Sequence, residues 1–131
     1  MPSKQTAGSA GHDLFSPVTS EVPPFGWEKI PLGLVMEMPR HHCGLIYSRS
    51  GLSLRGLVVA NGVGVIDNDY RGELSVIMHN RTGVPFLIEE GDRIAQLIVM
   101  AVPVLTFLEM DDVDKLTRTD RSADGFGSTG A

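Results

Sequence analysis

The sequence is poor in cysteine and in aromatic residues, and it has no long hydrophobic run. Its single cysteine, Cys43, cannot form an internal disulfide, which favours a reducing compartment or a fold indifferent to the redox state. The longest apolar run, residues 97–105, contains Pro103 and is far shorter than a membrane-spanning helix requires. Residues 1–6 lack the apolar core of a signal peptide. We therefore expect a soluble, intracellular protein.

The chain also lacks an excess of positive charge. It has 11 Lys and Arg against 16 Asp and Glu, a net charge of −5. This balance opposes binding to nucleic acid or to a membrane surface through bulk positive charge. Eight of the 11 cations are arginine, whose planar guanidinium suits phosphate and carboxylate groups. A local anion site is therefore compatible with the acidic total.

Glycine and proline, 15 and 8 residues, are spread along the 131-residue chain and oppose a helical bundle. Short apolar or alternating runs lie between them, which predicts one all-β domain, a sandwich or a barrel. At most a short helical turn is expected, over 50–55 or 111–116. The predicted strands are Asp13–Ser16, Trp27–Leu32, Leu34–Met38, Gly44–Tyr47, Val63–Ile66, Glu73–His79, Val84–Ile88, Arg93–Met100 and Val104–Leu108.

Two of these runs carry more detailed predictions. In 73–79, alternation places Leu74, Val76 and Met78 on one face of a half-buried strand. The run 94–100 is apolar on both faces apart from Gln96. Because a small domain covers few strands on both sides, this second run suggests a subunit interface.

Hydrophobic residues become scarce after about residue 116, and we divide the chain there. Residues 1–116 are predicted to form the β-barrel core, and residues 117–131 a polar C-terminal tail. Composition alone favours a frayed terminus. The alternative is a tail that orders over a bound ligand.

Several short segments could carry chemistry, although each also has a purely structural interpretation. The segment 66–72 is typical of a hairpin loop, in which Asp67 could accept a proton from water and Tyr70 could form a flat wall. The turn 49–52 suits a phosphate, because a hydroxyl and successive amides can point at one anion. In 91–96, Gln96 needs hydrogen-bond partners if it is buried. The glycine-rich run 125–130 lacks the lysine of a nucleotide P-loop.

Two further clusters are expected to carry no function. His41, His42 and Cys43 are adjacent, and neighbouring strand residues face opposite ways, so a zinc site is not expected there. Asp111, Asp112 and Asp114 are typical of a solvated stretch.

Taken together and in this order, five motif segments closely resemble those of the trimeric all-β dUTP pyrophosphatases (dUTPases). The resemblance spans residues 10 to 130. Small departures occur at His12, Ser48 and Ser122, the last standing where the family commonly has glycine. The five segments are Ala10–Leu14, Arg49–Leu52, Gly64–Gly72, Gly91–Leu97, and Arg121 with Gly125–Gly130.

The resemblance implies a jelly-roll or distorted β-barrel that assembles as a homotrimer with shared active sites. It implies hydrolysis of dUTP to dUMP and pyrophosphate by water attack on the α-phosphorus. This reaction would limit uracil incorporation into DNA and supply dUMP for thymidylate synthesis. Asp67 would be the general base. Mg²⁺ would be held chiefly by the phosphates, with Asp13 assisting through water.

The same resemblance assigns the substrate contacts. The hairpin would select uracil and deoxyribose, the second and fourth segments would bind phosphate, and the tail would close over the site. In the family, these three parts come from three different subunits. The implied substrate-binding residues are Arg49, Ser50, Gly51, Asn61, Gly64, Tyr70, Gln96, Arg121, Phe126, Gly127, Ser128 and Thr129.

Two rival interpretations remain. The related deoxycytidine triphosphate deaminases share the fold, but the intact Asp67-x-Asp69-Tyr70 and the tail with Phe126 favour a dUTPase. A non-catalytic regulatory module of the same fold could have lost Asp67 or the tail, whereas this chain retains both.

Overall fold

The computed structural model spans the chain, and the structure describes residues 1–125. The regular structure of this part is almost entirely β, as predicted, with a single short α-helix and one turn of 3-10 helix. The elements are β1 (His12–Phe15), β2 (Ser20–Val22), β3 (Trp27–Pro31), β4 (His42–Tyr47), α1 (Ser50–Leu54), β5 (Leu57–Val59), β6 (Val63–Ile66), β7 (Ser75–Asn80), β8 (Phe86–Ile88), β9 (Arg93–Ala101) and η1 (Val113–Lys115).

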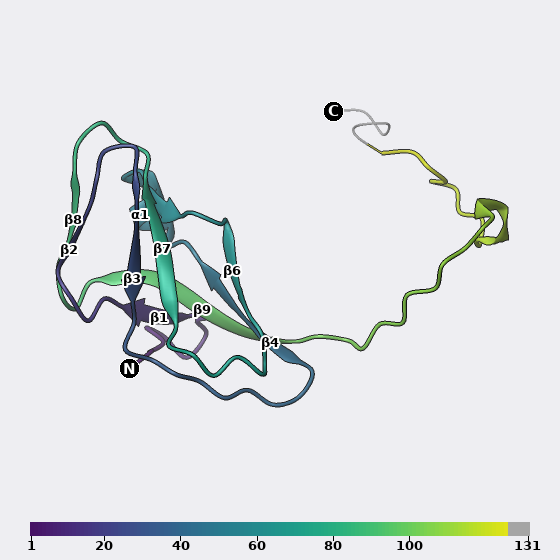
Figure 1. Ribbon diagram of the computed structural model, residues 1–131, viewed down its shortest axis with the longest axis horizontal. Helices are drawn as coiled ribbons and strands as arrows, with labels where there is room; N and C mark the ends of the chain where they lie inside the picture. Colours follow the sequence, from purple (N-terminus) through teal and green to yellow (C-terminus); the bar gives the residue numbers. More distant parts are fainter. Residues whose placement is uncertain (126–131) are drawn as a thin grey trace.

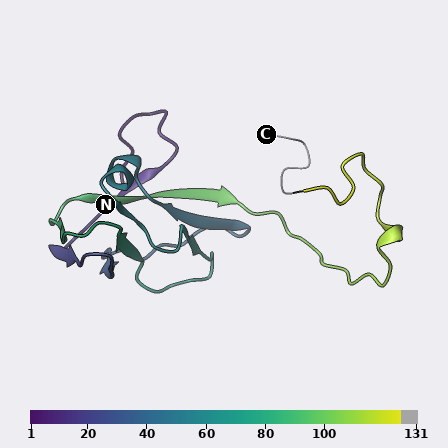
Figure 2. The same cartoon turned by 90° about the horizontal axis from the view of Figure 1, so that it is seen from above.

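The strands form three sheets around one core (Figures 1 and 2). The largest has the order β1-β9-β4-β6, and the others are β3-β7-β5 and the pair β2-β8. All pairings are antiparallel, and each pair joins strands that are not consecutive along the chain, so long-range pairing builds the sheets. The long strand β9 lies between β1 and β4. It therefore brings the first and the last strand of the chain together in one sheet.

The alternation predicted for 73–79 is confirmed in β7. Leu74, Val76 and Met78 are at most 2% exposed, whereas Ile77 is 37% exposed. The three buried side chains pack into one hydrophobic cluster with residues from the other sheets. This shared core explains why three small sheets behave as one domain.

Asn80, at the end of β7, is fully buried and all its side-chain hydrogen bonds are made within the chain. Its amide donates to the carbonyl oxygens of Val22 and Val84, at 3.2 and 2.7 Å. Its Oδ1 accepts from the backbone N–H and the hydroxyl of Thr82. The residue thus ties β7 to the β2-β8 pair.

Two of the predicted strands are absent. Residues 34–38 are an extended segment without a ladder, held to the core by Leu34 and Met36. Residues 104–108 lie in an exposed arm, where Phe107 and Leu108 are 89% and 82% exposed. Neither segment has a partner strand within the part of the chain that the structure describes. Conversely, β2 and β5 were not predicted.

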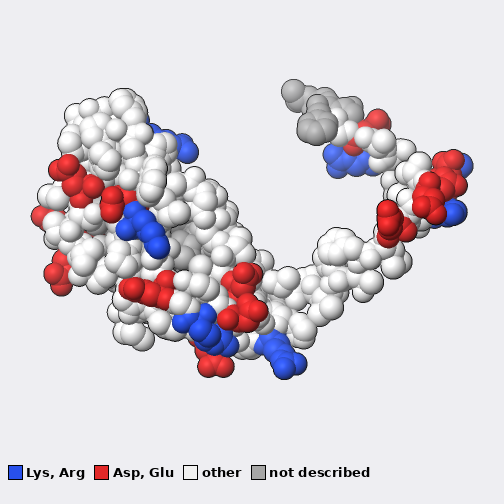
Figure 3. All heavy atoms as spheres, viewed as in Figure 1, with Lys and Arg blue, Asp and Glu red and all other residues white. Residues whose placement is uncertain are grey.

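The chain leaves the barrel at the end of β9. Residues 102–125 extend away from the core as an arm, and only η1 interrupts it (Figures 1 and 2). Acidic side chains gather on this arm, and both signs of charge are interspersed over the viewed face of the core (Figure 3). Among residues 1–125, no helix is long and apolar enough to cross a membrane.

Candidate active site

Strand register brings three of the motif segments together. Asp13 on β1 pairs with Gln96 on β9, and Gln96 pairs with Tyr47 on β4. Directly paired residues point to the same face of an antiparallel sheet. Ser48 and Arg49 follow Tyr47 immediately, so the second motif segment begins beside the first and the fourth.

These segments line a cleft of about 350 Å³. Its lining includes Asp13, Arg49, Ser50, Gly51 and Gln96, which are all the predicted phosphate-side residues of the core. The remaining lining residues come from the loop before β1, and they are Gln5, Ser9, Ala10 and Gly11. The second and fourth segments, which the resemblance places in one subunit, therefore lie together in this chain, and the first segment lies beside them.

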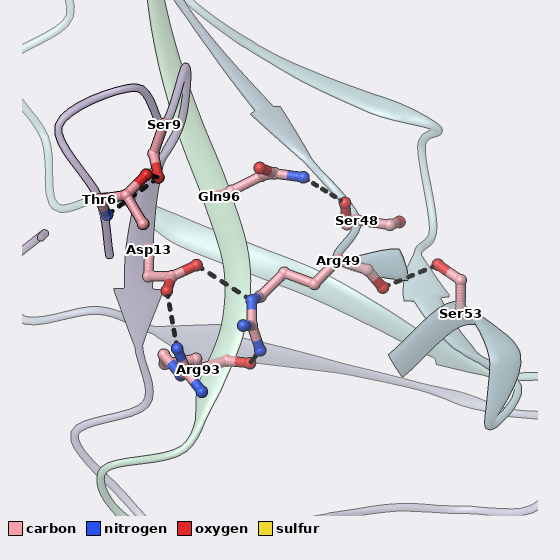
Figure 4. Close-up of polar contacts among 8 residues, drawn as sticks. All are labelled: Thr6, Ser9, Asp13, Ser48, Arg49, Ser53, Arg93 and Gln96. Carbon is pink, nitrogen blue, oxygen red and sulfur yellow. Dashed lines mark hydrogen bonds and ion pairs between the residues drawn. The ribbon is translucent and has the colours of Figure 1, made fainter. Parts of the chain in front are cut away.

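Asp13 is the electrostatic centre of this cleft (Figure 4). The residue is 8% exposed, and its carboxylate accepts from Arg49 Nε at 3.0 Å and from Arg93 Nη1 at 3.3 Å. Arg49 Nη1 also donates to the backbone carbonyl of Arg93 at 3.0 Å. A nearly buried carboxylate needs such partners, because an unpaired charge there would be costly.

Gln96 is half-buried, and its side chain is held by the second motif segment. Its Nε2 donates to the carbonyl of Ser48 at 3.0 Å (Figure 4). The Ser48 hydroxyl in turn accepts from the backbone N–H of Val59 at 2.8 Å. Ser48, one of the departures from the family pattern, therefore has a structural role in anchoring β5 beside the cleft.

The turn at 49–51 exposes backbone donors to the cleft. Arg49 caps α1, and the carbonyl of Arg49 accepts from Leu52 and Ser53. The first amides of a helix have no partner within the helix, and here they belong to Ser50 and Gly51. A Cβ built on Gly51 meets no atom within 4 Å, so the protein's own packing does not require glycine at this position.

The prediction of a hairpin loop over 66–72 is wrong, because β6 pairs with β4 while β7 lies in a different sheet. The hairpin segment, residues 61–72, instead includes β6 and leads from it toward the other sheet, and a second hollow, of about 240 Å³, is lined in part by its Asp67 and Tyr70. Asp67 follows β6 and is exposed, and its carbonyl accepts from the N–H of Tyr70 at 3.2 Å. The Tyr70 hydroxyl donates to the Glu73 carbonyl at 3.1 Å, which fixes the ring across the loop. Asp67 also lines an open depression that faces His42 and Cys43.

Asn61 and Gly64 lie at the other end of β6. Asn61 is exposed in the turn between β5 and β6, and its carbonyl accepts from Val63 at 2.8 Å. A Cβ on Gly64 would come within 3.3 Å of the Ile46 Cβ, so close packing against β4 explains this glycine.

Within one chain, the hairpin and the cleft do not meet. No residue lines both the hollow at Asp67 and the cleft at Asp13. The described part of the tail, residues 117–125, lines neither the cleft nor the hollow at Asp67. Arg121 is exposed, and among residues 1–125 its side chain bonds only to the Asp124 carbonyl, at 3.0 Å. Phe126, Gly127, Ser128 and Thr129 lie outside the residues that the structure describes.

Comparison with known proteins identifies the family. The dUTPase family model matches residues 1–130. The chain belongs to the dUTPase family. It is 44% identical over 129 residues to the deoxyuridine 5'-triphosphate nucleotidohydrolase of cowpox virus, covering 98% of this chain and 84% of that protein. It is 43% identical over 134 residues to the enzyme of the same name from Desulfitobacterium hafniense, covering 99% and 87%.

The fold agrees with that assignment. The dUTPase of Staphylococcus bacteriophage 80alpha, solved with dUPNHPP, is 26% identical and matches with a TM-score of 0.90. The match covers 100% of this chain and 92% of that one. The predicted dUTPase-like fold is therefore confirmed.

In this dUTPase-family chain, the structure adds residues that the sequence left without a role. Gln5 and Ser9 line the cleft although they precede the first motif segment. Arg93 lies inside the fourth segment, but only the folded sheet reveals its contact with Asp13. Ser122, where the family commonly has glycine, has a φ of 46°, in the left-handed region that glycine adopts at little cost.

Proposed function

We propose that this dUTPase-family chain hydrolyses dUTP to dUMP and pyrophosphate, with water attacking the α-phosphorus. The observation that carries the proposal is the grouping of the motif segments into two complementary surfaces. One is a cleft rich in hydrogen-bond donors that can bind an anion, and the other is the hairpin segment, with an exposed carboxylate and a fixed aromatic ring. A nucleoside triphosphate needs both kinds of surface.

The cleft would bind the phosphates. Ser50, Gly51 and Gln96 supply a hydroxyl, amides and a carboxamide, and Arg49 supplies a guanidinium. The open space over Gly51 supports this role, because it leaves room for a phosphate to approach the backbone.

The hairpin segment would supply the general base and the selectivity for uracil and deoxyribose. Asp67 would orient and deprotonate the attacking water. The backbone from Asn61 onward, including Gly64, would pair with uracil, and cytosine would leave polar groups unpaired, a mismatch that can discriminate by about 10⁴–10⁵. Tyr70 would pack against the deoxyribose where a ribose 2′-hydroxyl would lie, which rejects UTP.

The donor set fits a magnesium ion carried by the substrate rather than by the protein. In the described chain, no three His, Cys, Asp or Glu side chains group as metal ligands. Asp13 lies in the phosphate cleft, and each carboxylate oxygen has a lone pair beyond its arginine bond. It would hold the ion through water, and the ion would neutralise phosphate charge beside Asp67.

The active unit would be a homotrimer with sites shared between subunits. Two observations support this proposal: the cleft and the hairpin segment are separate within one chain, and the arm extends away from the core. Val99 and Met100, on the two-sided strand, are 42% and 48% exposed in the single chain, as expected of an interface. The tail, with Arg121 and residues 126–129, would close over a site on a neighbouring subunit.

The first test is pyrophosphate release from dUTP with Mg²⁺, beside dCTP, dTTP and UTP. We expect turnover of dUTP alone, and Asp67→Asn to abolish turnover while nucleotide binding is retained. The matched control is Glu21→Gln, an exposed carboxylate on β2 that should leave the rate unchanged. Equal activity of wild type and Asp67→Asn would remove the role of Asp67. Release of ammonia from dCTP would favour the deaminase reading, and nucleotide binding without any turnover would favour the regulatory module.

A further inference from the structure

Arg93, at the start of β9, is joined to Arg49 in two ways. Its side chain donates to Asp13 Oδ2, while Arg49 Nε donates to the other oxygen of the same carboxylate. Its backbone carbonyl accepts directly from Arg49 Nη1 at 3.0 Å. The guanidinium of Arg49 is therefore held on two sides, and Arg93 is involved in both.

The charges explain why this arrangement depends on all three residues. Two guanidinium groups repel each other, and Asp13 offsets that repulsion by accepting from both. The Asp13 side chain is 11% exposed, against 26% for Arg49 and 41% for Arg93, so water screens the contact with Arg93 more than the contact with Arg49. Without the Arg93 side chain, Asp13 would lose one of its two cations and the constraint that orients it toward Arg49.

The side chain of Arg93 lies beside the cleft and not in its lining. Arg93 is absent from the cleft lining but lines a neighbouring hollow of about 200 Å³, together with Arg49. Arg49 lines both. A guanidinium carries five N–H groups, and two of those of Arg49 are used by Asp13 and the Arg93 carbonyl. The remaining groups are available to an anion in the cleft.

We propose that Arg93 is a positioning residue that acts through Asp13 to orient Arg49 toward the phosphates of the bound nucleotide. This inference rests on the proposed function and extends it to a residue outside the cleft. Arg93 does not touch the substrate. Its effect is therefore expected in binding of the phosphates and not in binding of the nucleoside.

The test measures the Kd of the imido analogue dUPNHPP with Mg²⁺ for the full chain, and the Kd of deoxyuridine as a competitor. In Arg93→Ala, the Kd for dUPNHPP should rise about tenfold, the size of one well-placed charge-assisted contact. The Kd for deoxyuridine should change less than about twofold, because deoxyuridine has no phosphate for Arg49 to bind. Arg93→Lys keeps the charge and should restore most of the affinity.

A double-mutant cycle separates this role from direct contact. If Arg93 acts through Arg49, then Arg49→Ala with Arg93→Ala should bind dUPNHPP no more weakly than Arg49→Ala alone. The matched control is Arg81→Ala, an exposed arginine without a side-chain hydrogen bond or ion pair among residues 1–125, which should bind as wild type. Should Arg93→Ala not fold, Arg93→Gln compared with Arg93→Lys makes the same distinction.

Three results would overturn the inference. One is unchanged affinity of Arg93→Ala for dUPNHPP. Another is equal weakening for dUPNHPP and deoxyuridine, which would indicate a general structural role. The third is multiplicative losses in the cycle, which would indicate direct contact with substrate. Failure of the proposed function is distinct, because wild type itself would then release no pyrophosphate from dUTP.

Discussion

The Tyr70 ring lies over Gly72, and this contact holds the proposed sugar wall in position. A Cβ built on Gly72 would overlap the phenol oxygen and ring of Tyr70. The ring is also held by the bond from its hydroxyl to the Glu73 carbonyl. The position of the wall therefore depends on the absence of one side chain.

Gly72→Ala should weaken the discrimination between dUTP and UTP. The added methyl displaces the Tyr70 ring, and we expect the ratio of kcat/KM for the two nucleotides to fall about tenfold or more, the range for a change in pocket shape. Steady-state kinetics with both nucleotides measure this ratio. Gly8→Ala is the control, since its Cβ meets no atom within 4 Å. An unchanged ratio in Gly72→Ala would show that Tyr70 is not the wall.

The two faces of β7 differ in burial, and substitutions on them should therefore differ in their effect on stability. Met78→Ala removes a side chain with no exposed surface and should lower the free energy of unfolding by about 2–4 kcal/mol. Ile77→Ala removes one that is 37% exposed and should cost less than about 1 kcal/mol. Urea unfolding at fixed protein concentration compares them. Equal losses would contradict the alternation.

How much the sequence predicted depended on the length and partners of each element. Alternation found β7, and the two-sided pattern found β9, because each is at least six residues long. The strands β2 and β5 have three residues each, too few to show a period. Residues 104–108 have the composition of a strand but lack a partner in the described chain, and a ladder needs one.

The candidate site shows the same division between local and distant information. Asp67, Tyr70 and the turn 49–51 are contiguous motif segments, so the resemblance could indicate them directly. The pairing of Asp13 with Arg93 joins residues 80 positions apart, and only the register of β1 against β9 brings them together. For that reason the sequence places Arg93 within a motif segment but predicts no role for it.

For the whole molecule, the arm and tail are the parts that a single chain leaves unexplained. Apolar side chains from Val102 to Leu116 are exposed, with Phe107 at 89%. Burying such side chains against another subunit would stabilise an assembly. The polar residues beyond Leu116 make only local contacts among those described, which fits a role in closure and not in folding.

Removal of residues 117–131 should therefore separate activity from stability. We expect kcat to fall about 100-fold or more, because closure excludes water and aligns the nucleophile. The thermal unfolding midpoint should shift by no more than about 2 °C, since residues 117–125, the described part of the tail, contribute nothing to the hydrophobic core. A truncated chain with full turnover would contradict the closing role, and a large drop in the midpoint would place the tail in the fold.

Each proposed active site joins the hairpin segment of one subunit to the cleft of another, and subunit mixing tests this arrangement most directly. Asp67→Asn inactivates the hairpin and Gln96→Ala with Ser50→Ala inactivates the cleft, so each variant alone should be inactive. Refolding an equal mixture should restore about a quarter of the wild-type rate of pyrophosphate release, the share of sites that combine an intact hairpin with an intact cleft in random trimers. A mixture that stays as inactive as its components would contradict active sites shared between subunits.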